Sequence, residues 1–316
     1  MRILLRLGFV LLPLVTIFAC TAATQKENAL TTSGPTESQK KDPKADLQKQ
    51  IELIAARAKG RVGVAAEVLE TGESVSLSLH EHYPMQSVYK LPIGMAVLDQ
   101  VDQGKLKLEQ RVRVEKKDMV GPALLSPIRD RNPNGVELSL NEILRFAVSE
   151  SDGTASDVLL KLVGVEAVTR YLSELGVTEI VVANSENEIS QDWQTQYRNW
   201  ASPYGAVQLL RALNERRKLS EPSQQLLFKF MTETPTGPRR LKGLLPPATV
   251  VAHKTGTSGS SEGITAATND IGLITLPNGK HLAIAVFVSD SPADLVTRER
   301  VIAEIARAVW DGFSKG

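Results

Sequence analysis

Two residues that could act as nucleophile and base, Ser87 and Lys90, stand three positions apart where a helical pattern begins. Residues three apart on a helix lie on one face, so their side chains are within reach of each other. A serine hydroxyl is a weak nucleophile until a base removes its proton, and a lysine can be that base where burial or a nearby cation lowers its pKa. The spacing alone is weak evidence, because Ser38 and Lys41 share it inside a polar segment. A serine that begins a helix beside a surface lysine is the ordinary alternative.

A second candidate lies between two helical segments, in the sequence Ser151-Asp152-Gly153. The Ser151 hydroxyl could pass a proton to a leaving group. The same three residues also suit an ordinary turn between helices, because Ser, Asp and Gly are favoured in turns. On its own, this motif is better interpreted as a turn.

A third candidate, Lys254-Thr255-Gly256-Thr257, follows a strand-like segment. A strand with this sequence can offer a cation and hydroxyls to a substrate carboxylate, and a backbone N–H to an oxyanion. It is not a phosphate-binding loop, because that motif places Lys-Ser/Thr after the glycines and not before them. The ordinary alternative is a polar strand followed by a loop.

The four histidines do not predict a metal enzyme. His80 and His82 alternate on an extended stretch, and His253 and His281 lie in strand patterns. No HExxH or similar spacing is present, so neither a metal nor another cofactor is expected. We interpret all four as partly exposed residues of strands.

Strand patterns at both ends of the folded part must position these motifs. A helix is predicted from residue 46 to 58, then strands at 61–70 and 74–80, and further strands at 265–276 and 281–290 around a hairpin signal at Pro277-Asn278-Gly279-Lys280. A final helix is predicted to open at Ser291-Pro292-Ala293-Asp294, with proline as its first residue.

Between these strands the pattern is helical. Helices are predicted at 91–103, 139–150, 155–164, 165–176, 202–215 and 221–233. Strands at both ends with helices between them predict one antiparallel sheet built from both termini, with an inserted helical domain facing it. The sequence shows no internal repeat.

The composition is that of a globular protein with ordinary chemistry. Of 316 residues, 42% are hydrophobic and 23% charged, with a net charge of +1, so no basic excess points to nucleic acid. The single cysteine excludes an internal disulfide and a multi-thiolate zinc site. That length corresponds to one large or two ordinary domains.

The lone cysteine, Cys20, ends an N-terminal segment typical of exported proteins. Arg2 and Arg6 precede a short apolar run, and the sequence Ile17-Phe18-Ala19-Cys20 resembles a bacterial lipoprotein box, in which the cysteine is lipidated. The alternative is a plain cleaved signal with an idle cysteine. Residues 21–45 are polar and read as a flexible tether, so we expect an exported protein, periplasmic or on the cell surface, attached to a bacterial membrane only by this lipid.

Taken in order, the three motifs resemble those of serine β-lactamases and penicillin-binding proteins. The resemblance covers nearly all of residues 46–316 and is strongest to class A β-lactamases, in particular those with an enlarged, atypical Ω loop. Ser151-Asp152 argues against class C enzymes, which use a tyrosine there. The resemblance implies a two-lobed α/β (α+β) fold: an antiparallel five-stranded sheet flanked by N- and C-terminal helices (46–83 and 233–316), and an inserted all-helical domain (84–232).

The resemblance also implies further site residues. The Ω loop should lie within residues 181–200, where Glu186 fits the glutamate that activates the deacylating water, with Glu188 as the runner-up. The usual Arg-Trp before that glutamate is absent, so the salt bridge that often holds this loop is not expected. Arg240 matches an arginine that helps bind the substrate carboxylate, and Gly153 replaces a common asparagine that contacts the substrate.

We therefore expect a class A β-lactamase that hydrolyses penicillins or cephalosporins through an acyl-enzyme on Ser87 and so confers resistance. Lys90, or Glu186 through a water, would remove the serine proton, and Ser151 would protonate the ring nitrogen. A small-molecule substrate, no nucleic acid and a monomer follow from this expectation. The alternatives are a penicillin-binding DD-peptidase and a catalytically silent cell-wall-binding lipoprotein.

Overall fold

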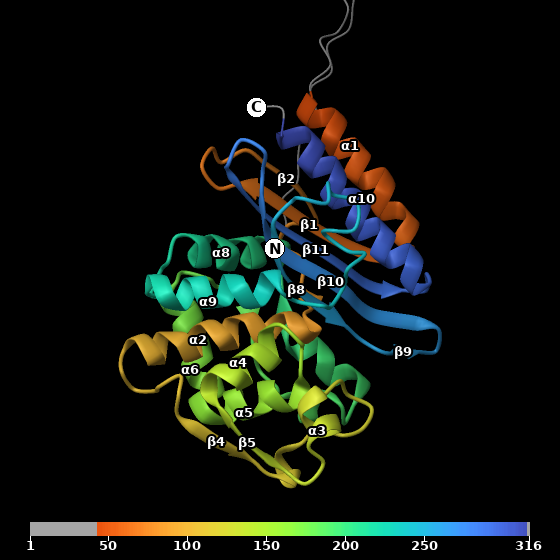
Figure 1. Ribbon diagram of the computed structural model, residues 1–316. Helices are drawn as coiled ribbons and strands as arrows, with labels where there is room; N and C mark the ends of the chain where they lie inside the picture. The colour runs from red at the N-terminus through yellow and green to blue at the C-terminus, as the bar shows by residue number, and fades with distance from the viewer. Residues whose placement is uncertain (1–42, 315–316) are drawn as a thin grey trace, which may run out of the picture. The chain divides into compact units, whose positions relative to one another are not determined.

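A central antiparallel sheet is built from both ends of the folded part, as the computed structural model describes it for residues 43–314 (Figure 1). Its order is β2-β1-β11-β10-β8, and the two-residue strand β9 pairs with β10. The strands are β1 (Arg61–Val68), β2 (Ser74–Leu77), β8 (Val251–Thr257), β9 (Ser260–Ser261), β10 (Ile264–Thr275) and β11 (His281–Ser291). The predicted hairpin joins β10 to β11, with Thr275 opposite His281.

Two helices cover one face of this sheet, α1 (Pro43–Ala55) and α10 (Leu295–Phe313), which lie side by side (Figure 1). Their apolar residues share one core with β1 and β11. The predicted start of the last helix was wrong by three residues. Asp294 is its N-cap and accepts a hydrogen bond from the Thr297 N–H, because a side-chain oxygen satisfies a free N–H of the first turn, so Pro292 lies before the helix.

The middle of the chain is mainly helical and packs on the opposite face. Its helices are α2 (Lys90–Asp102), α3 (Pro127–Arg131), α4 (Leu140–Val148), α5 (Gly153–Val163), α6 (Val165–Glu174), α7 (Glu186–Ile189), α8 (Pro203–Asn214) and α9 (Glu221–Thr232). Short 3-10 helices cover Ala56–Ala58, Gln86–Tyr89, Lys116–Asp118 and Trp193–Arg198. Each predicted helix of this region is present within a few residues of its expected ends.

Two small antiparallel sheets interrupt these helices, so the inserted region is not helical throughout. One pairs β4 (Arg111–Val114) with β5 (Val136–Ser139), and the other has the order β3-β7-β6 from Tyr83–Pro84, Trp200–Ala201 and Ile180–Val181. Their strands are only two to four residues long, too short for a period-two pattern to reveal them.

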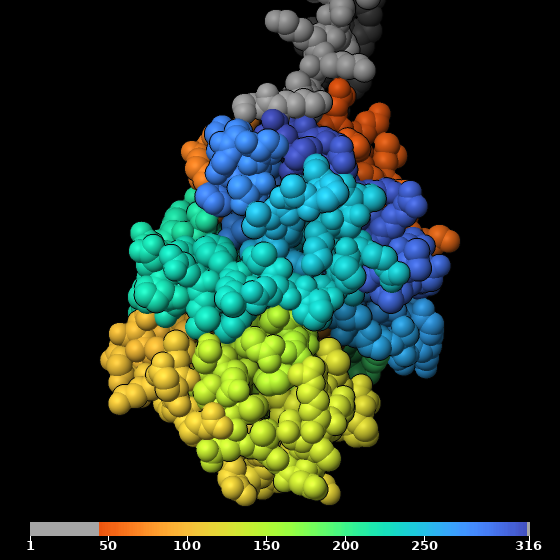
Figure 2. Space-filling view, viewed as in Figure 1, coloured from red at the N-terminus to blue at the C-terminus, as the bar shows by residue number. Residues whose placement is uncertain are grey.

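The segment before Ser87 lies directly against strand β8. A side chain at Gly256 would place its Cβ 2.2 Å from the Met85 carbonyl oxygen, so only glycine allows this approach. Asn269 on β10 donates to the Pro84 carbonyl at 2.8 Å. In the space-filling view the cyan residues after α9 lie at the surface between blue residues of the C-terminal part and yellow-green residues of the helical part (Figure 2). Among residues 43–314, no helix has the length and apolar character to cross a membrane.

Candidate active site

The predicted nucleophile and its lysine meet at the start of α2. Ser87 lies in the 3-10 turn before the helix, and Lys90 is the first helical residue, with only 1% of its surface exposed. The Lys90 Nζ donates to the Ser87 Oγ at 2.9 Å and to the Ser151 carbonyl at 2.8 Å. It also lies 2.7 Å from a Glu186 carboxylate oxygen. All three ammonium protons therefore have an acceptor.

Ser151 is held in a left-handed conformation, with φ of 59°, between α4 and α5. The next residue fixes it: the Asp152 side chain caps α5 through the Ala155 N–H at 2.9 Å and accepts the Ile128 N–H at 2.6 Å. Burial raises the pKa of Asp152, while these N–H donors oppose the rise. The predicted Ser-Asp-Gly turn is therefore present, and the buried Asp152 cap also orients Ser151.

Strand β8 brings Lys254 to Ser151 from the other side. The Lys254 Nζ donates to the Ser151 Oγ at 2.9 Å, and the residue has no exposed surface. Burial lowers the pKa of Lys254 well below its usual value, and the nearby Lys90 ammonium lowers it further. Because the Ser151 oxygen accepts from Lys254, the hydroxyl proton of Ser151 is free to be donated.

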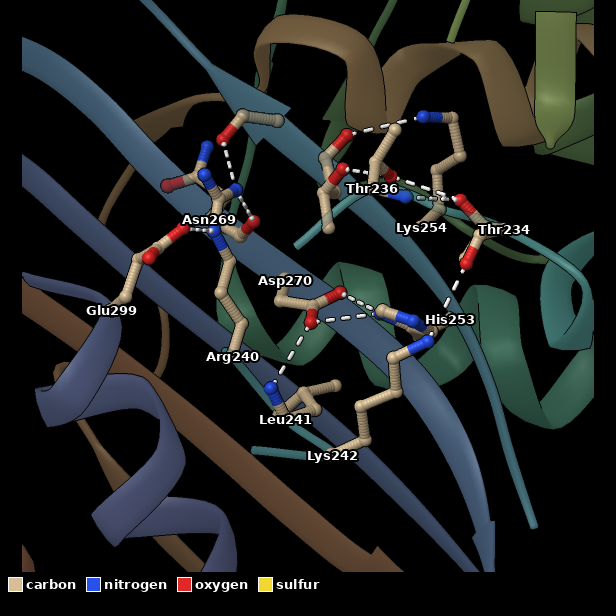
Figure 3. A network of polar contacts seen from close by, with 12 residues as sticks. Thr234, Thr236, Arg240, Leu241, Lys242, His253, Lys254, Asn269, Asp270 and Glu299 are labelled. Atoms are coloured by element: carbon tan, nitrogen blue, oxygen red, sulfur yellow. Dashed lines mark hydrogen bonds and ion pairs between the residues drawn. The ribbon is translucent and has the colours of Figure 1, made fainter. Parts of the chain in front are cut away.

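Arg240 lies buried beside the end of β8 and is held there by four hydrogen bonds from its guanidinium (Figure 3). Its guanidinium donates to the Thr257 hydroxyl at 2.7 Å and to the carbonyls of Gly256 and Asn269 at 3.1 and 2.9 Å. Its Nε donates to Glu299 of α10 at 3.3 Å. This rigid clamp presents a positive charge and the exposed Thr257 side chain together.

Three threonine hydroxyls form a chain beneath Lys254 that sequence analysis did not find (Figure 3). Thr234 donates to the Ser149 carbonyl at 2.7 Å, Thr236 lies 2.9 Å from Thr234, and Thr255 lies 2.7 Å from Thr236. Since the single Thr234 proton is committed to the carbonyl, Thr236 must donate to Thr234 and Thr255 to Thr236. The Thr257 hydroxyl, which accepts from a guanidinium, keeps its own proton for a ligand.

Glu186 begins the short helix α7 within the predicted Ω loop and is buried. Asp157 of α5 holds it there, because its two carboxylate oxygens accept the N–H groups of Glu186 and Asn187 at 2.7 and 3.0 Å. Burial raises the pKa of Asp157 to about 6, against the effect of these two hydrogen bonds. Glu188 is exposed and caps α7 through Ser185, so the geometry favours Glu186 as the reactive glutamate.

The two ends of this loop are joined by a buried amide in place of the usual salt bridge. The Asn199 Oδ1 accepts the N–H groups of Ala183 and Asn184 at 2.7 and 2.8 Å, and its Nδ2 returns to the Asn184 carbonyl. Gln196 of the loop accepts a hydrogen bond from Gln86, the neighbour of Ser87, at 2.6 Å. The loop is therefore tied to the nucleophile segment.

A pocket of about 670 Å³ opens over most of the predicted site residues, while Lys254 lies just beneath its surface, fully buried, and reaches it through the Ser151 hydroxyl. Ser87, Lys90, Ser151, Glu186, Arg240, Thr255 and Thr257 line it, with Ω-loop residues from Ile189 to Trp193 along one side. Gly153 lies behind Glu186, and a Cβ there would be 3.4 Å from the Glu186 Cγ and 3.3 Å from the Leu125 carbonyl, so a larger residue would crowd the glutamate. Within residues 43–314, no three His, Cys, Asp or Glu side chains gather as metal ligands would.

This pocket can form an ester on Ser87 and then let water release it, so fold and site together define a serine hydrolase of the acyl-enzyme type. The sequence matches the β-lactamase enzyme family over residues 46–313. It is 42% identical to β-lactamase VEB-1 of Pseudomonas aeruginosa, over 85% of this chain and 90% of that protein. It is 44% identical to the extended-spectrum β-lactamase PER-1 of the same organism, over 84% and 86%.

Solved structures agree. A β-lactamase from Chitinophaga pinensis is 47% identical with a TM-score of 0.82, covering 84% of this chain and 98% of that one. A class A β-lactamase from Bacteroides cellulosilyticus is 33% identical with a TM-score of 0.82, covering 87% and 100%. The chain belongs to the β-lactamase enzyme family. The predicted class A serine β-lactamase, its antiparallel sheet with added helices, and its hydrolase class are confirmed.

Proposed function

We propose that this enzyme hydrolyses the β-lactam amide of penicillins and cephalosporins through an ester on Ser87. One observation carries the proposal: the Lys90 Nζ touches both the Ser87 Oγ and the Glu186 carboxylate, at 2.9 and 2.7 Å. The nucleophile Ser87 and the second acid–base group Glu186 are therefore both in contact with the base, Lys90. The DD-peptidase and the silent binding lipoprotein have no use for such a buried glutamate beside the lysine.

Acylation begins with the proton on Lys90. Glu186 accepts a proton from the Lys90 ammonium, and the neutral amine then takes the Ser87 proton as the serine oxygen bonds to the lactam carbonyl carbon. The N–H groups of Ser87 and Thr257 hold the resulting oxyanion. In the alternative route Glu186 takes the serine proton through a water, and Lys90 remains a cation throughout.

Ring opening needs a proton on the lactam nitrogen. Ser151 supplies it, because its oxygen already accepts from Lys254 and its own proton is free. As the C–N bond breaks, Ser151 gives this proton to nitrogen and recovers one from the Lys90 ammonium, which contacts the Ser151 carbonyl. The neutral Lys90 amine then takes back the proton that Glu186 holds, so Glu186 is again a carboxylate. The product of this step is an acyl ester on Ser87 with the lactam ring open.

Deacylation uses Glu186 a second time. Its carboxylate takes a proton from a water whose oxygen attacks the ester carbonyl, and the ester breaks to return the Ser87 hydroxyl and a free acid. During both steps Lys254 and Arg240 attract the substrate carboxylate, and Thr257 donates to it. Thr255 can join them once its hydroxyl turns away from Thr236.

Cephalosporins with bulky acylamido side chains are proposed among the substrates. Support comes from the extended-spectrum relative named above and from the pocket wall formed by the Ω loop around Trp193. Hydrolysis of such compounds would confer resistance to them. The check is kcat/KM for a bulky oxyimino cephalosporin measured beside benzylpenicillin. An undetectable rate for the cephalosporin would remove this part of the proposal.

The mechanism is tested with Glu186→Gln and the matched control Glu188→Gln. Wild-type protein should turn over a chromogenic cephalosporin rapidly. Glu186→Gln should lose at least about a hundredfold in kcat, and a species heavier by the opened substrate should accumulate in the intact mass spectrum. Glu188→Gln should retain nearly full turnover. A stable adduct in the wild type would point to a penicillin-binding protein, and no reaction at all to a binding module.

The N-terminal assignments remain part of the proposal, because residues 1–42 lie outside the described part of the chain. Export, cleavage and lipidation at Cys20 rest on the lipoprotein-box sequence. The boundary predicted between the tether (21–45) and the catalytic unit (46–316) was wrong by three residues, because helix α1 begins at Pro43; the tether is proposed for residues 21–42. Metabolic labelling with a tagged fatty acid should mark the wild type and not Cys20→Ser. Unlabelled wild-type protein would refute lipidation. We also propose a monomer, which size-exclusion chromatography with light scattering checks.

A further inference from the structure

A buried histidine–aspartate pair lies beneath the strand that carries Lys254. His253 of β8 and Asp270 of β10 have no exposed surface, and the proposed mechanism uses neither (Figure 3). Our expectation that His253 is a partly exposed strand residue was wrong, because β8 is buried on both faces: the residues from Val251 to Gly256 are all buried, and His253 has no exposed surface. A buried ionisable pair beside a catalytic strand needs a physical reason.

The hydrogen bonds determine where the negative charge resides. The His253 Nδ1 lies 2.9 Å from both oxygens of Asp270, so Nδ1 carries a proton and donates it to the carboxylate. The His253 Nε2 has no partner among the described residues. A second proton there would be a buried, charged donor without an acceptor, which costs more than a bare lone pair. His253 is therefore neutral, and Asp270 carries one full negative charge.

We propose that the His253–Asp270 pair is a positioning unit for the two cations that hold the substrate carboxylate. Asp270 supplies a buried negative charge behind Lys254, and it fixes the turn that carries Arg240. His253 keeps the carboxylate charged and oriented through its Nδ1–H. The inference rests on the proposed function only in assigning the carboxylate to Lys254 and Arg240.

For Lys254, the surrounding charges show what Asp270 contributes. Lys254 is faced by Lys90 of α2, Glu186 of α7, Arg240 of the segment after α9, and Asp270 of β10. Burial lowers the pKa of Lys254, as do the two cations, whereas Asp270 and Glu186 raise it.

Of the two carboxylates, only Glu186 has a cation in contact. Glu186 is paired with Lys90 at 2.7 Å, whereas within residues 43–314 no lysine or arginine lies within 4 Å of Asp270. Asp270 is therefore the buried charge left to favour the protonated form of Lys254.

For Arg240, Asp270 holds the backbone. The Leu241 N–H donates to the Asp270 Oδ2 at 3.1 Å, immediately after the arginine. On the other side, the Arg240 N–H donates to the Gly237 carbonyl at 3.0 Å, in a turn where Gly237 has φ of 59°. These two hydrogen bonds hold the backbone on both sides of Arg240, whose guanidinium donates to Thr257.

Variants can separate the effect of the Asp270 charge from the effect of the hydrogen bonds that Asp270 accepts. Asp270→Asn keeps an oxygen for the Leu241 N–H and removes the charge, so the basic limb of the pH profile of kcat/KM should move down by roughly one pH unit as Lys254 loses its proton more easily. KM should rise more than kcat falls. His253→Asn keeps a donor at the place of Nδ1 and should behave like wild type. His253→Leu removes the donor and should resemble Asp270→Asn.

Either of two kinetic results would contradict a positioning role for the His253–Asp270 pair. If Asp270→Asn has the wild-type basic limb, or if His253→Asn is as impaired as His253→Leu, the pair is only structural. Should a variant fail to fold by circular dichroism, ¹⁵N NMR of wild-type His253 in the assay buffer decides: a proton on Nδ1 alone is expected from the hydrogen bonds, and an imidazolium overturns the inference. Wild-type turnover is measured first, so a failure of the proposed function is seen separately.

Discussion

The carboxylate of Asp157 makes folding stability depend on pH in an unusual direction. It lies half-buried behind the Ω loop, close to Glu186, and its partial burial raises its pKa to about 6 from 3.8. A carboxyl group whose pKa rises on folding contributes stability that is fully present below pH 3.8 and is lost as the pH rises through 6. The charged form therefore destabilises the enzyme at the pH where it works. Replacing Asp157 by asparagine removes that charge and keeps the shape.

The size of the effect follows from the two pKa values. Linkage between 3.8 and about 6 gives a penalty of about 1.5 kcal/mol at pH 5 and about 3 kcal/mol at pH 8, since each pKa unit is worth about 1.4 kcal/mol. Asparagine removes the charge, but only its Oδ1 can accept, so one of the N–H groups of Glu186 and Asn187 loses its acceptor at every pH. Asp157→Asn should thus be less stable than wild type at pH 4, by about 1–3 kcal/mol for the lost hydrogen bond, and should recover about 1.5 kcal/mol of that difference by pH 5 and about 3 kcal/mol by pH 8.

Urea unfolding followed by circular dichroism at pH 5, 6, 7 and 8 measures this difference. Subtracting wild type from variant cancels the other groups that titrate in the range, so the growth of the difference, about 1.5 kcal/mol from pH 5 to 8, belongs to Asp157. Removing the charge of Glu142 in the same way serves as the control. Glu142 is largely exposed, and hydrogen bonds from Ser139 lower its pKa, which is the opposite direction to the shift at Asp157. A difference for Asp157→Asn that stays constant with pH would refute the buried charge.

Further predictions concern strand β8 and its arginine. Gly256→Ala would place a Cβ 2.2 Å from the Met85 carbonyl oxygen. We therefore expect kcat/KM to fall by at least about tenfold in kinetic assays, and the free energy of unfolding in urea to fall by about 2 kcal/mol. Wild-type values for both would contradict the close approach. Arg240→Ala should raise KM by at least about tenfold for a β-lactam with a free carboxylate. The same change should have far less effect on its methyl ester, and the exposed neighbour in Arg239→Ala should leave KM within about twofold for both. Equal losses on acid and ester would mean that Arg240 does not bind the carboxylate.

The parts of this site that the sequence predicts are those encoded over short distances. Ser87 and Lys90 are three residues apart, and the turn at Ser151 consists of adjacent residues, so their local geometry follows from spacing. Lys254 was linked to them by the order of the motifs along the chain, which identifies a family but contains no distances. The sheet was equally accessible, because long strands such as β10 and β11 carry an apolar pattern and a hairpin turn between them.

The residues that support the site could not be predicted in this way. Asp157 lies at an ordinary position of α5, and only the folding of the Ω loop over it makes it a partner of Glu186. Asp270 lies in an apolar strand 16 residues beyond Lys254, and no spacing rule relates the two. His253 was interpreted as a partly exposed strand residue, because one sequence cannot show that both faces of its strand are covered. Burial is a property of the whole fold.

Each of the three buried cations of the site has a supporting carboxylate nearby, and the placement of these carboxylates explains how the pocket can still attract an anion. Lys90, Lys254 and Arg240 are each supported by a carboxylate from a different element: Glu186, Asp270 and Glu299. An ammonium or guanidinium buried without such a charge would lose its proton or unfold the site. For Lys254 and Arg240, however, the carboxylates come from β10 and α10, on the sheet side, while the cationic groups reach toward Ser151 and Thr257. Because the interaction between charges falls with distance, a substrate carboxylate in the pocket meets the cations first and the supporting anions from farther away. The countercharges that make burial possible therefore leave the pocket side positive.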